Sequence, residues 1–507
     1  MCGFFITNDP RIDETYENII EETLRFRGPD CSSGLIAFSN GWSAYHSRLS
    51  IIDLSSGVNQ PVYEEHGGLL VFNGEILNYK SLGYKYFNKE YFSDTLLLSD
   101  LLVTKQLNFL ELDGFFSFVY VNSEGKLEKA ARDPFGVKPL FYYENNGYFS
   151  FSSEPSTLKE IYKLDVNQLA ISEYKAIRAP IFSNTFFCGV EIVEPGSCLV
   201  NGTYFDCKDY LKENYSEVNI DLVKGKILDG INSRVVSDAP VGLLLSRGID
   251  SHLLKNLSQI ERYYSIGFKG DGDYEYLAEQ EYENLKLISV KPEEYRKDFE
   301  FLLSLRKEPM SVPNEVLLYR VAKEAKNEGI KVLLSGEGAD EFFAGYDRVF
   351  QWGKNEINFN LKDFLRLYCY SMPEEEGHVY KEFKRLFEQV AEMSCFEQVR
   401  WFFVRYHMPI LFRRLDFALM AAGVEGREPL ANIHTFMVSI SLSPDDLMGE
   451  KLGKLPLREL IEPYEGSNFA YEDKIGFPVD LTKIFKNTKN LNSYELWFEK
   501  NLEVLER

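Results

Sequence analysis

The first residue with the means to do chemistry is a cysteine beside the start of the chain. Cys2 follows the initiator methionine and precedes Gly3. A small residue at this position permits removal of Met1, which would leave a thiol and a free α-amine on one residue. Such an amine, with a pKa near ~8, can act as the general base for the thiol. Chance placement is the alternative, so Cys2 alone does not decide between a nucleophile and an ordinary cysteine.

Two loops of small and acidic residues follow predicted strands, and the first of them has the setting of an anion-binding site. Residues 246–251 (SRGIDS) stand between the apolar run 241–245 and a helical pattern, and residues 335–341 (SGEGADE) follow the apolar run 331–334. A small-residue loop at a helix N-terminus presents free N–H groups and the positive end of the helix dipole to an anion. The first loop is not a Walker A loop, because no GK[ST] follows it. For the second loop the alternative is an ordinary turn rich in glycine and acidic residues.

Short apolar runs separated by turn residues dominate the first two hundred residues. β-Branched and aromatic residues are enriched in these runs, which favours strands, and two helical patterns interrupt them. The predicted strands include residues 34–38, 69–75, 115–121 and 149–154, and the predicted helices cover residues 16–26 and 95–105. The turn-rich residues 194–202 close this region, and a polar stretch follows. We therefore expect an antiparallel β-rich domain with a few helices over residues 2–205.

The pattern changes to strand, loop and helix in the second part of the chain. Repeats of this pattern predict a parallel sheet with helices on both faces, and such sheets bind ligands at the carboxyl ends of their strands. Helical patterns dominate from about Leu361 onward. The 507 residues also exceed the ~250–300 at which single cores stop growing. A second domain is therefore expected over residues 216–507, as an α/β unit with a helical C-terminal part.

Composition argues against several classes of partner and leads us to expect a cytoplasmic protein. The net charge of −22 argues against non-specific binding to nucleic acid or an anionic membrane, both of which need clustered positive charge. The seven cysteines are odd in number and include no CxxC pair, so neither a disulfide framework nor a zinc site is indicated. The start of the chain lacks the features of a signal peptide, and no apolar run approaches the ~20 residues of a membrane span.

A series of short motifs in a fixed order gives the Cys2 region its context. They are RGPD (27–30), HSRLSIIDL (46–54), QP (60–61), NGEILNY (73–79), SDT (93–95), RDPFGVKPLFYY (132–143) and SSE (152–154). With these motifs the chain resembles the class II glutamine amidotransferases, whose glutaminase domain is an N-terminal-nucleophile (Ntn) fold. The resemblance covers residues 2–200, and several ordered motifs are far more specific than any one of them.

The resemblance implies a role for each matched residue. Cys2 would attack the side-chain amide of glutamine, forming a thioester and releasing ammonia. The Asn73 side chain and the Gly74 N–H would form the oxyanion hole, where one donor is worth ~2.7–4 kcal/mol. Arg48 would pair with the glutamine α-carboxylate, while Asp94 and Glu75 would receive its α-amino group. The alternatives are a surface ion pair for Arg48 and a hairpin turn for Asn73-Gly74.

The second part of the chain is similar to the ATP pyrophosphatase-type domain of asparagine synthetases. Residues 246–251 resemble its pyrophosphate loop, usually SGGxDS, and residues 335–341 match its second signature. The resemblance implies ATP binding by Leu245, Ser246, Gly248, Asp250, Ser251, Ile266, Ser335 and Gly336, Mg²⁺ binding by Asp250 and Asp340, and catalytic roles for Glu337 and Lys454. Glu337 would accept a proton from the incoming ammonia, and Lys454 would steady the phosphates during adenylation. For Lys454 the alternative is a solvated side chain on a helix.

Arg247 is a clear departure from the family pattern in the pyrophosphate loop. Glycine is usual at this position, where it allows a positive φ and close approach to phosphate. Arginine removes that freedom and adds a positive charge. Pyrophosphate is therefore expected to bind differently or less well, and a synthetase site that has decayed is the alternative.

Other departures lie in the segments expected to frame the acceptor. Phe417 stands where the family has arginine, and residues 423–432 lack the usual final aspartate. Residues 474–477 (KIGF) keep the lysine of their motif but not the arginine before it, and residues 308–319 keep little beyond EP. The acceptor side thus departs from the family more than the glutaminase side.

The sequence therefore predicts a glutamine-dependent ligase that uses ATP and Mg²⁺ to adenylate a carboxylate and then amidates it with ammonia from glutamine. Aspartate is the expected acceptor. A sugar uronate, a peptide or a secondary-metabolite acid is the first alternative, and a glutaminase or regulatory protein with a silent ATP site is the second. The expected partners are small molecules, and the resemblance adds a homodimer as an expectation.

Overall fold

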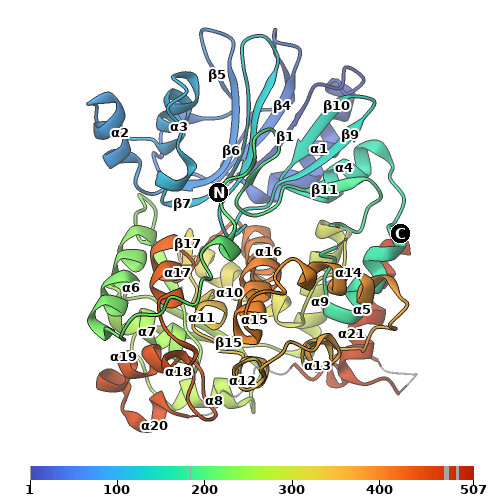
Figure 1. The fold of residues 1–507 in the computed structure, drawn as a ribbon. Helices are drawn as coiled ribbons and strands as arrows, with labels where there is room; N and C mark the ends of the chain where they lie inside the picture. Colours follow the sequence, from blue (N-terminus) through green and yellow to red (C-terminus); the bar gives the residue numbers. More distant parts are fainter. Residues whose placement is uncertain (1, 183, 473–478, 487–489, 507) are drawn as a thin grey trace.

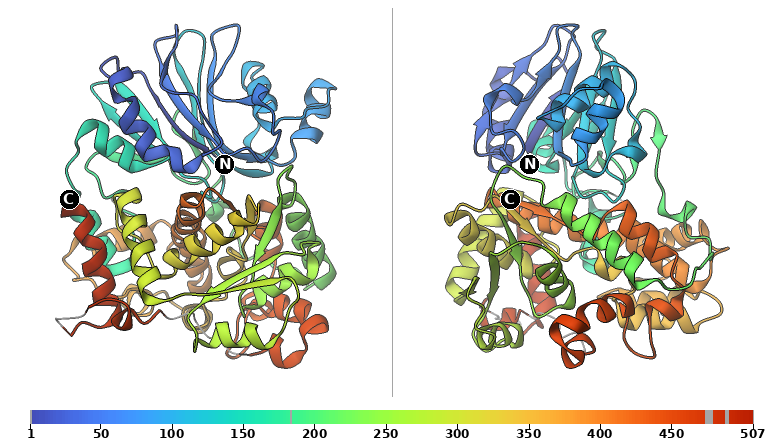
Figure 2. Two further views of the ribbon diagram at one scale, coloured as in Figure 1. Left: turned by 180° about the vertical axis from the view of Figure 1, so that it is seen from behind. Right: turned by 90° about the vertical axis from the view of Figure 1, so that its left-hand side faces the viewer.

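The computed structural model describes residues 2–182, 184–472, 479–486 and 490–506. Two antiparallel sheets with flanking helices form the N-terminal part, and a parallel sheet surrounded by helices forms the C-terminal part (Figure 1). This is the predicted fold class. The N-terminal end of the chain lies at the boundary between the two parts in all three views (Figures 1 and 2). None of the described helices is long and apolar enough to cross a bilayer.

The N-terminal part is a sandwich of two sheets. One sheet has the order β11-β9-β10-β1-β4-β2, with β3 beside β4, and the other has the order β13-β12-β8-β7-β6-β5. The strands are β1 (Cys2–Thr7), β2 (Cys31–Ser32), β3 (Ile36–Ala37), β4 (Ser43–Arg48), β5 (Val62–Tyr63), β6 (Leu69–Ile76), β7 (Gly114–Val121), β8 (Leu127–Arg132), β9 (Phe141–Asn145), β10 (Tyr148–Ser152), β11 (Val190–Ile192), β12 (Ser197–Cys198) and β13 (Gly202–Thr203). The predicted strands at 69–75, 115–121 and 149–154 are confirmed within one or two residues, whereas 34–38 contributes only the short β3.

Alternation along β6 explains why the sandwich carries helices on its outer faces. Leu69 and Val71 pack with Phe4 of β1 between the sheets, whereas Leu70 and Phe72 face the other way and pack against α3. A strand buried on both faces reads as a continuous apolar run because its side chains alternate between two cores. The helices are α1 (Glu17–Leu24), α2 (Tyr79–Phe87), α3 (Asp94–Val103), α4 (Pro155–Tyr162) and α5 (Gln168–Ile177). The predicted helices at 16–26 and 95–105 are α1 and α3.

The C-terminal part contains a five-stranded parallel sheet with the order β16-β15-β14-β17-β18. Its strands are β14 (Val241–Leu244), β15 (Tyr263–Gly267), β16 (Leu285–Ser289), β17 (Val332–Leu334) and β18 (Glu425–Arg427). From β14 the chain builds outward to β15 and β16, and it then returns to place β17 on the other side of β14. The strand order thus reverses between the neighbouring strands β14 and β17, and the chain leaves their ends in opposite directions. This creates the crevice where such sheets bind ligands.

Helices make up most of the remaining C-terminal part. Helix α6 (Ile220–Arg234) precedes β14, and α7 (Ile249–Leu257), α8 (Gly272–Glu279), α9 (Pro292–Arg306) and α10 (Asn314–Asn327) lie between β14 and β17. After β17 come α11 (Ala339–Phe342), α12 (Asp347–Asn355), α13 (Leu361–Tyr368), α14 (His378–Glu388), α15 (Cys395–Phe402), a π-helical turn (Phe403–His407), α16 (Met408–Ala421), α17 (Ile433–Ile440), α18 (Pro444–Leu447), α19 (Leu455–Glu465), α20 (Ser467–Ala470) and α21 (Ser493–Leu502). This confirms the expected helical C-terminal region. Residues 211–219, which precede α6, contain no helix or strand.

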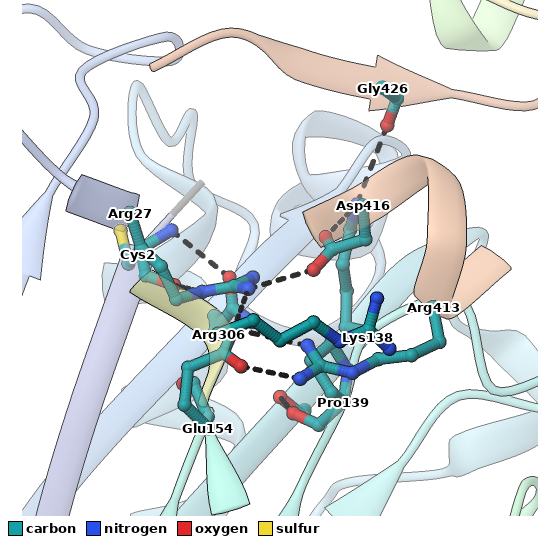
Figure 3. A network of polar contacts seen from close by, with 12 residues as sticks. Cys2, Arg27, Lys138, Pro139, Glu154, Arg306, Arg413, Asp416 and Gly426 are labelled. Carbon is teal, nitrogen blue, oxygen red and sulfur yellow. Dashed lines mark hydrogen bonds and ion pairs between the residues drawn. The ribbon is translucent and has the colours of Figure 1, made fainter. Parts of the chain in front are cut away.

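A buried network of charges joins the two parts (Figure 3). Arg27 Nη1 lies 2.6 Å from Glu154 Oε1 and 2.8 Å from Asp416 Oδ2 of α16. Asp416 also lies 3.5 Å from Lys138 Nζ, and Arg413 donates to Glu154 at 3.1 Å. Burial alone would raise the pKa of Asp416, but Arg27 and Lys138 hold it below its ordinary value. Each half thus supplies charges that the other half neutralises.

We expect Asp416→Asn to destabilise the protein by about 3–5 kcal/mol, because it leaves buried cations without their anion while barely changing the side-chain volume. Urea unfolding followed by circular dichroism measures this change. Asp363→Asn is the control, since Asp363 forms an exposed ion pair with Arg366 and should change stability by less than about 0.5 kcal/mol. Equal unfolding midpoints for the two variants would contradict the prediction.

Candidate active site

Cys2 begins β1 and lies opposite Arg48 of β4 in the strand register. Its backbone nitrogen donates to Asn73 Oδ1 at 3.0 Å, and its carbonyl oxygen accepts from Arg27 Nε at 3.1 Å. Only 7% of the residue is exposed. Burial raises the pKa of the Cys2 thiol, so the thiol is protonated at neutral pH and needs a base to become a nucleophile.

Asn73 and Gly74 lie within strand β6 and not at a hairpin turn. Asn73 Nδ2 is buried and has no hydrogen-bond partner among the described residues. A buried donor without a partner is costly, and at a reactive centre it can serve a charge that forms during the reaction. Gly74 has a φ of +138°, and a Cβ there would lie 2.1 Å from the Phe115 carbonyl oxygen. Only glycine therefore fits beside Asn73.

Two buried carboxylic acids, Glu75 and Asp94, lie next to this centre. Asp94 is the first residue of α3, and it accepts hydrogen bonds from Ile76 N at 2.9 Å and Thr95 N at 2.8 Å. Burial raises the pKa of Asp94 to about 6, although these N–H donors and a hydrogen bond with Glu75 oppose the rise. Burial and the charge of Asp94 raise the pKa of Glu75 well above its ordinary value. The pair therefore suits a cationic partner, which would favour the ionised forms.

Arg48 is buried, which removes the surface-ion-pair alternative. Its Nη1 donates to Ser55 O at 2.6 Å and to Asn59 Oδ1 at 2.8 Å, and its Nη2 donates to Ile52 O at 3.3 Å. The guanidinium thus orders the loop of residues 52–59 beside Cys2. Pairing with a glutamine carboxylate stays a prediction, and it requires that some of these contacts be shared or exchanged.

A cavity of about 750 Å³ opens where β14 and β17 end. The residues predicted for ATP, metal and acyl-transfer roles all line it: Leu245, Ser246, Gly248, Asp250, Ser251, Ile266, Ser335, Gly336, Glu337, Asp340 and Lys454. These residues come from three strand ends and from the start of α19. The volume is within the range of ligand-binding cavities, ~300–1,000 Å³.

Local hydrogen bonds hold the first phosphate loop in shape. Ser251 Oγ lies 3.0 Å from the carbonyls of Ser246 and Gly248, and Gly248 N donates to Ser246 Oγ at 3.1 Å. The second loop lies directly against the first, since a Cβ on Gly336 would be 2.7 Å from Asp250 Cβ. Glycine at position 336 is therefore needed for the two loops to meet.

Lys454 lies between the carboxylates of the two loops. Its Nζ is 2.7 Å from Asp250 Oδ2 and 2.8 Å from Asp340 Oδ1. The residue is 3% exposed and precedes α19 with a φ of 59°, while its backbone N–H donates to Phe343 O at 2.9 Å. It is therefore not a solvated helix side chain. Its position supports the predicted role in steadying phosphates.

The two aspartates also have the chemistry of a magnesium site completed by phosphate. Asp250 Oδ1 is buried and has no hydrogen-bond partner among the described residues. Mg²⁺ is commonly bound by one or two carboxylates together with water and substrate phosphates. In the part of the chain that the structure describes, no group of three or more His, Cys, Asp or Glu side chains is placed to hold a metal. The residues fit an ion that enters with a nucleotide.

Arg247 occupies its place in the loop without backbone strain, because it is not among the residues with positive φ. Its guanidinium pairs with Glu472 and lies 4.9 Å from the centre of the Tyr276 ring. The charge added by this departure is thus already neutralised within the protein. Glycine is not required at this position by the backbone conformation.

Three further polar residues of the cavity were not predicted. Arg414 pairs with Glu337, the Tyr346 hydroxyl donates to Glu341 at 2.6 Å, and His407 Nε2 lies 3.1 Å from that hydroxyl. Burial raises the pKa of Glu341 to about 8. Tyr346 follows the 335–341 motif closely enough to be noticed, but no sequence signal connects His407 or Arg414 with the distant loop.

In the structure, some of the departures from the family pattern line the cavity and others lie away from it. Ser311, Val312 and other residues of the 308–319 segment line the cavity. Phe417 instead packs in the core, 5.7 Å from the Phe26 ring, and Asn432 caps α17 by accepting from Thr435 N at 2.9 Å. Neither of these two residues lines the cavity. Residues 474–477 lie outside the described residues.

Comparisons with known proteins agree with these two centres. Residues 222–503 match the asparagine synthase family, and residues 1–211 match the glutamine amidotransferase domain.

The chain is 32% identical over 377 residues to asparagine synthetase [glutamine-hydrolyzing] 1 of Bacillus subtilis (strain 168), an alignment that covers 68% of this chain and 59% of that protein. It is 28% identical over 411 residues to amidase chry2 of Gibberella zeae, covering 68% and 60%. Asparagine synthetase B [glutamine-hydrolyzing] of Escherichia coli (strain K12) is 27% identical over 515 residues, covering 94% and 82%. The chain thus spans about three fifths of the length of the first two relatives.

We expect Gly336→Ala to lower kcat/KM for ATP by about 10²-fold, because the added methyl group pushes the two phosphate loops apart. Isothermal titration with ATP and steady-state kinetics measure the effect. Gly225→Ala in α6 is the matched control, since a Cβ there meets no atom within 4 Å and alanine favours the helix. Equal ATP kinetics in the two variants would show that the close approach at Gly336 is unimportant.

Proposed function

Because the chain belongs to the asparagine synthase family, we propose that it is a glutamine-dependent ligase that uses ATP to amidate a carboxylate, with aspartate as the acceptor and asparagine as the product. The observation that carries this proposal is the cavity after β14 and β17, which gathers every residue expected to bind or activate ATP. The Cys2 centre in the same chain supplies a means of making ammonia. A cytoplasmic location remains a prediction from composition, and a homodimer remains a prediction from the family resemblance.

The Cys2 centre is suited to hydrolysing the side-chain amide of glutamine. After removal of Met1, the α-amine of Cys2 would take the thiol proton, and the sulfur would attack the amide carbon. Asn73 Nδ2, together with the Gly74 N–H, would then donate to the oxyanion. Collapse of this intermediate gives a thioester and ammonia, and water releases glutamate from the thioester. A base within the same residue matters here because burial raises the pKa of the thiol.

The second centre is suited to forming an acyl adenylate. An oxygen of the acceptor carboxylate would attack the α-phosphorus of ATP, breaking its bond to the pyrophosphate group. The loop of residues 246–251 and Lys454 would hold the phosphates, and the contacts of Lys454 with Asp250 and Asp340 fix its ammonium where that charge arrives. Mg²⁺ bound by these two aspartates would neutralise part of the phosphate charge.

Amidation then needs ammonia in its neutral form. Most free ammonia at neutral pH is ammonium, which is not a nucleophile, so transfer inside the protein protects it from protonation. Ammonia would attack the acyl carbon and displace AMP while Glu337 accepts the proton that is lost. Arg414 pairs with Glu337 and would hold its carboxylate in a fixed orientation.

A different acceptor is the second candidate, and one observation favours it. Tyr368, Phe403, Ile410 and Leu411 form part of the cavity wall, which is more apolar than aspartate requires. Such a wall also suits a larger carboxylic acid. A silent ATP site is less well supported, because Arg247 is accommodated without strain and its charge is paired.

The assay for the proposal measures pyrophosphate release from ATP and Mg²⁺, with ammonia as the nitrogen source and with or without aspartate. Ammonia bypasses Cys2 and therefore isolates the second centre. Aspartate-dependent release with formation of asparagine is the expected result. Release only with another member of a carboxylate panel would favour the second candidate, and no release with any acid would favour a silent site.

Cys2→Ala should abolish the glutamine-dependent reaction and leave the ammonia-dependent reaction within about twofold, because the thiol is needed only to free ammonia. Amino-acid analysis of product formation with each nitrogen source measures both rates. Cys198→Ala is the control, because Cys198 of β12 is also a buried free cysteine and has no predicted role in catalysis. Loss of the ammonia-dependent reaction in Cys2→Ala alone would contradict the assignment.

The pH dependence of glutamine use should follow the Glu75–Asp94 pair. Asp94 has a pKa of about 6, so it is ionised above that pH and protonated below it. The kcat/KM for glutamine should therefore fall as the pH drops below about 6, since the α-ammonium of glutamine loses its anionic partner. Asp94→Asn should lower kcat/KM and flatten this acid limb. An unchanged limb in the variant would remove Asp94 from glutamine binding.

A further inference from the structure

Arg178 is a residue of the N-terminal part that lines the cavity of the second centre. It follows α5 directly, with a φ of +66°, and its N–H donates to Tyr174 O at 2.7 Å. It also lines a neighbouring cavity of about 130 Å³ between the two parts of the protein, and Ser311 and Ile410 are shared by both cavities. No sequence motif singled out this arginine.

Two tyrosine rings hold the Arg178 guanidinium in place. Its Cζ lies 3.2 Å from the ring centre of Tyr370 and 4.8 Å from that of Tyr494 in α21. Tyr370 is itself fixed against the end of α5, because its N–H donates to Ala176 O at 2.8 Å. Next to it, Ser371 Oγ donates to Lys175 O at 3.0 Å. Stacking fixes the orientation of a guanidinium, whose N–H donors then point outward from its edge in its own plane.

The charge of Arg178 lacks the carboxylate partner that three other cations of the cavity have. Arg247 pairs with Glu472, Arg414 with Glu337, and Lys454 with two aspartates. Within the described residues, Arg178 forms no ion pair with a carboxylate; its Nε is buried without a hydrogen-bond partner, and Tyr494 is the side chain that hydrogen-bonds to the guanidinium. Burial lowers the pKa of Arg178 to about 10. An anion bound here would satisfy both the charge and the buried donor.

The surroundings of Arg178 separate this anion from the phosphates of ATP. The phosphates are accounted for by the loops after β14 and β17 and by Lys454. Beside Arg178 the wall comes instead from α13, the π-helical turn and α16, with Leu367, Tyr368, Phe403, Ile410 and Leu411 facing the cavity. A carboxylate that displaces water from this apolar wall gains more from a guanidinium than it would in solvent.

We propose that Arg178 binds a second anionic group of the acceptor, the one that is not adenylated. The acceptor class is then a dicarboxylic acid, of which aspartate is a member, with one carboxylate at the ATP loops and the other at Arg178. This inference rests on the proposed function. It makes Arg178 a specificity-determining residue, and it means that the N-terminal part completes the acceptor site of the C-terminal part.

The test compares aspartate with isoasparagine, whose α-carboxylate is replaced by a neutral amide, in the ammonia-dependent assay. The wild-type enzyme should prefer aspartate, and Arg178→Gln should raise KM for aspartate about 10- to 100-fold while leaving KM for ATP unchanged. The ratio of kcat/KM for the two acceptors should fall by the same factor, because isoasparagine never used the arginine. Arg178→Lys should retain part of the preference, since it keeps the charge without the planar fork.

Arg405→Gln controls for the loss of an arginine at the boundary of the two parts. Arg405 pairs with Glu194 and lines the smaller cavity but not the larger one, so it should affect stability without changing the acceptor ratio. If Arg178→Gln does not fold, the wild-type ratio and Arg178→Lys still decide the matter.

An unchanged ratio in the Arg178 variants, or a wild-type enzyme indifferent to the α-carboxylate, would overturn this inference alone. Failure of the wild-type enzyme to release pyrophosphate with any acid would overturn the proposed function and this inference with it.

Discussion

The guanidinium of Arg27 has no exposed surface, so its charge must be neutralised inside the protein. The two carboxylates that do so come from different parts of the chain: Glu154 from the N-terminal part and Asp416 from α16. A shift of one part against the other would leave a buried charge without its partner, at a cost of several kcal/mol. The same arginine donates to the carbonyl of Cys2. One buried cation therefore sets both the packing of the two parts and the position of the nucleophile.

The network continues from this point to the wall of the second centre. Arg413 contacts Glu308 at 3.1 Å, Glu308 contacts Arg306 at 3.0 Å, and Arg306 contacts Glu315 at 2.6 Å. Glu315 then accepts from Ser311 N at 2.6 Å, and Ser311 lines the cavity. Charged groups that satisfy one another in a low-dielectric interior form a rigid array. The two centres are thus fixed relative to each other by electrostatics as well as by apolar packing.

The second centre depends on a different constraint, the close approach of two loops. The parallel sheet brings the ends of β14 and β17 together because these strands are neighbours, and Gly336 allows the loops to touch. Their aspartates would repel each other without a cation between them, and Lys454 supplies that cation from the start of α19. The arrangement leaves Asp250 Oδ1 without a partner among the described residues. Paired charges and a remaining oxygen donor together suit the binding of a nucleotide with its metal.

Much of this protein was determined by local sequence. The apolar run in residues 69–75 predicted β6, the loops at 246–251 and 335–341 predicted two ligand-binding strand ends, and ordered motifs predicted the residues around Cys2. These features could be predicted because strand periodicity and helix-terminus chemistry are properties of short segments. The tertiary structure decided what no short segment contains: that Lys454 lies between two aspartates, one of them 204 residues away, that Asn432 is a helix cap, and that Arg178 reaches the cavity of the other part. Such contacts depend on how the sheets and helices pack, because the energy of a buried charge is set by its neighbours in space and not by its neighbours in the chain.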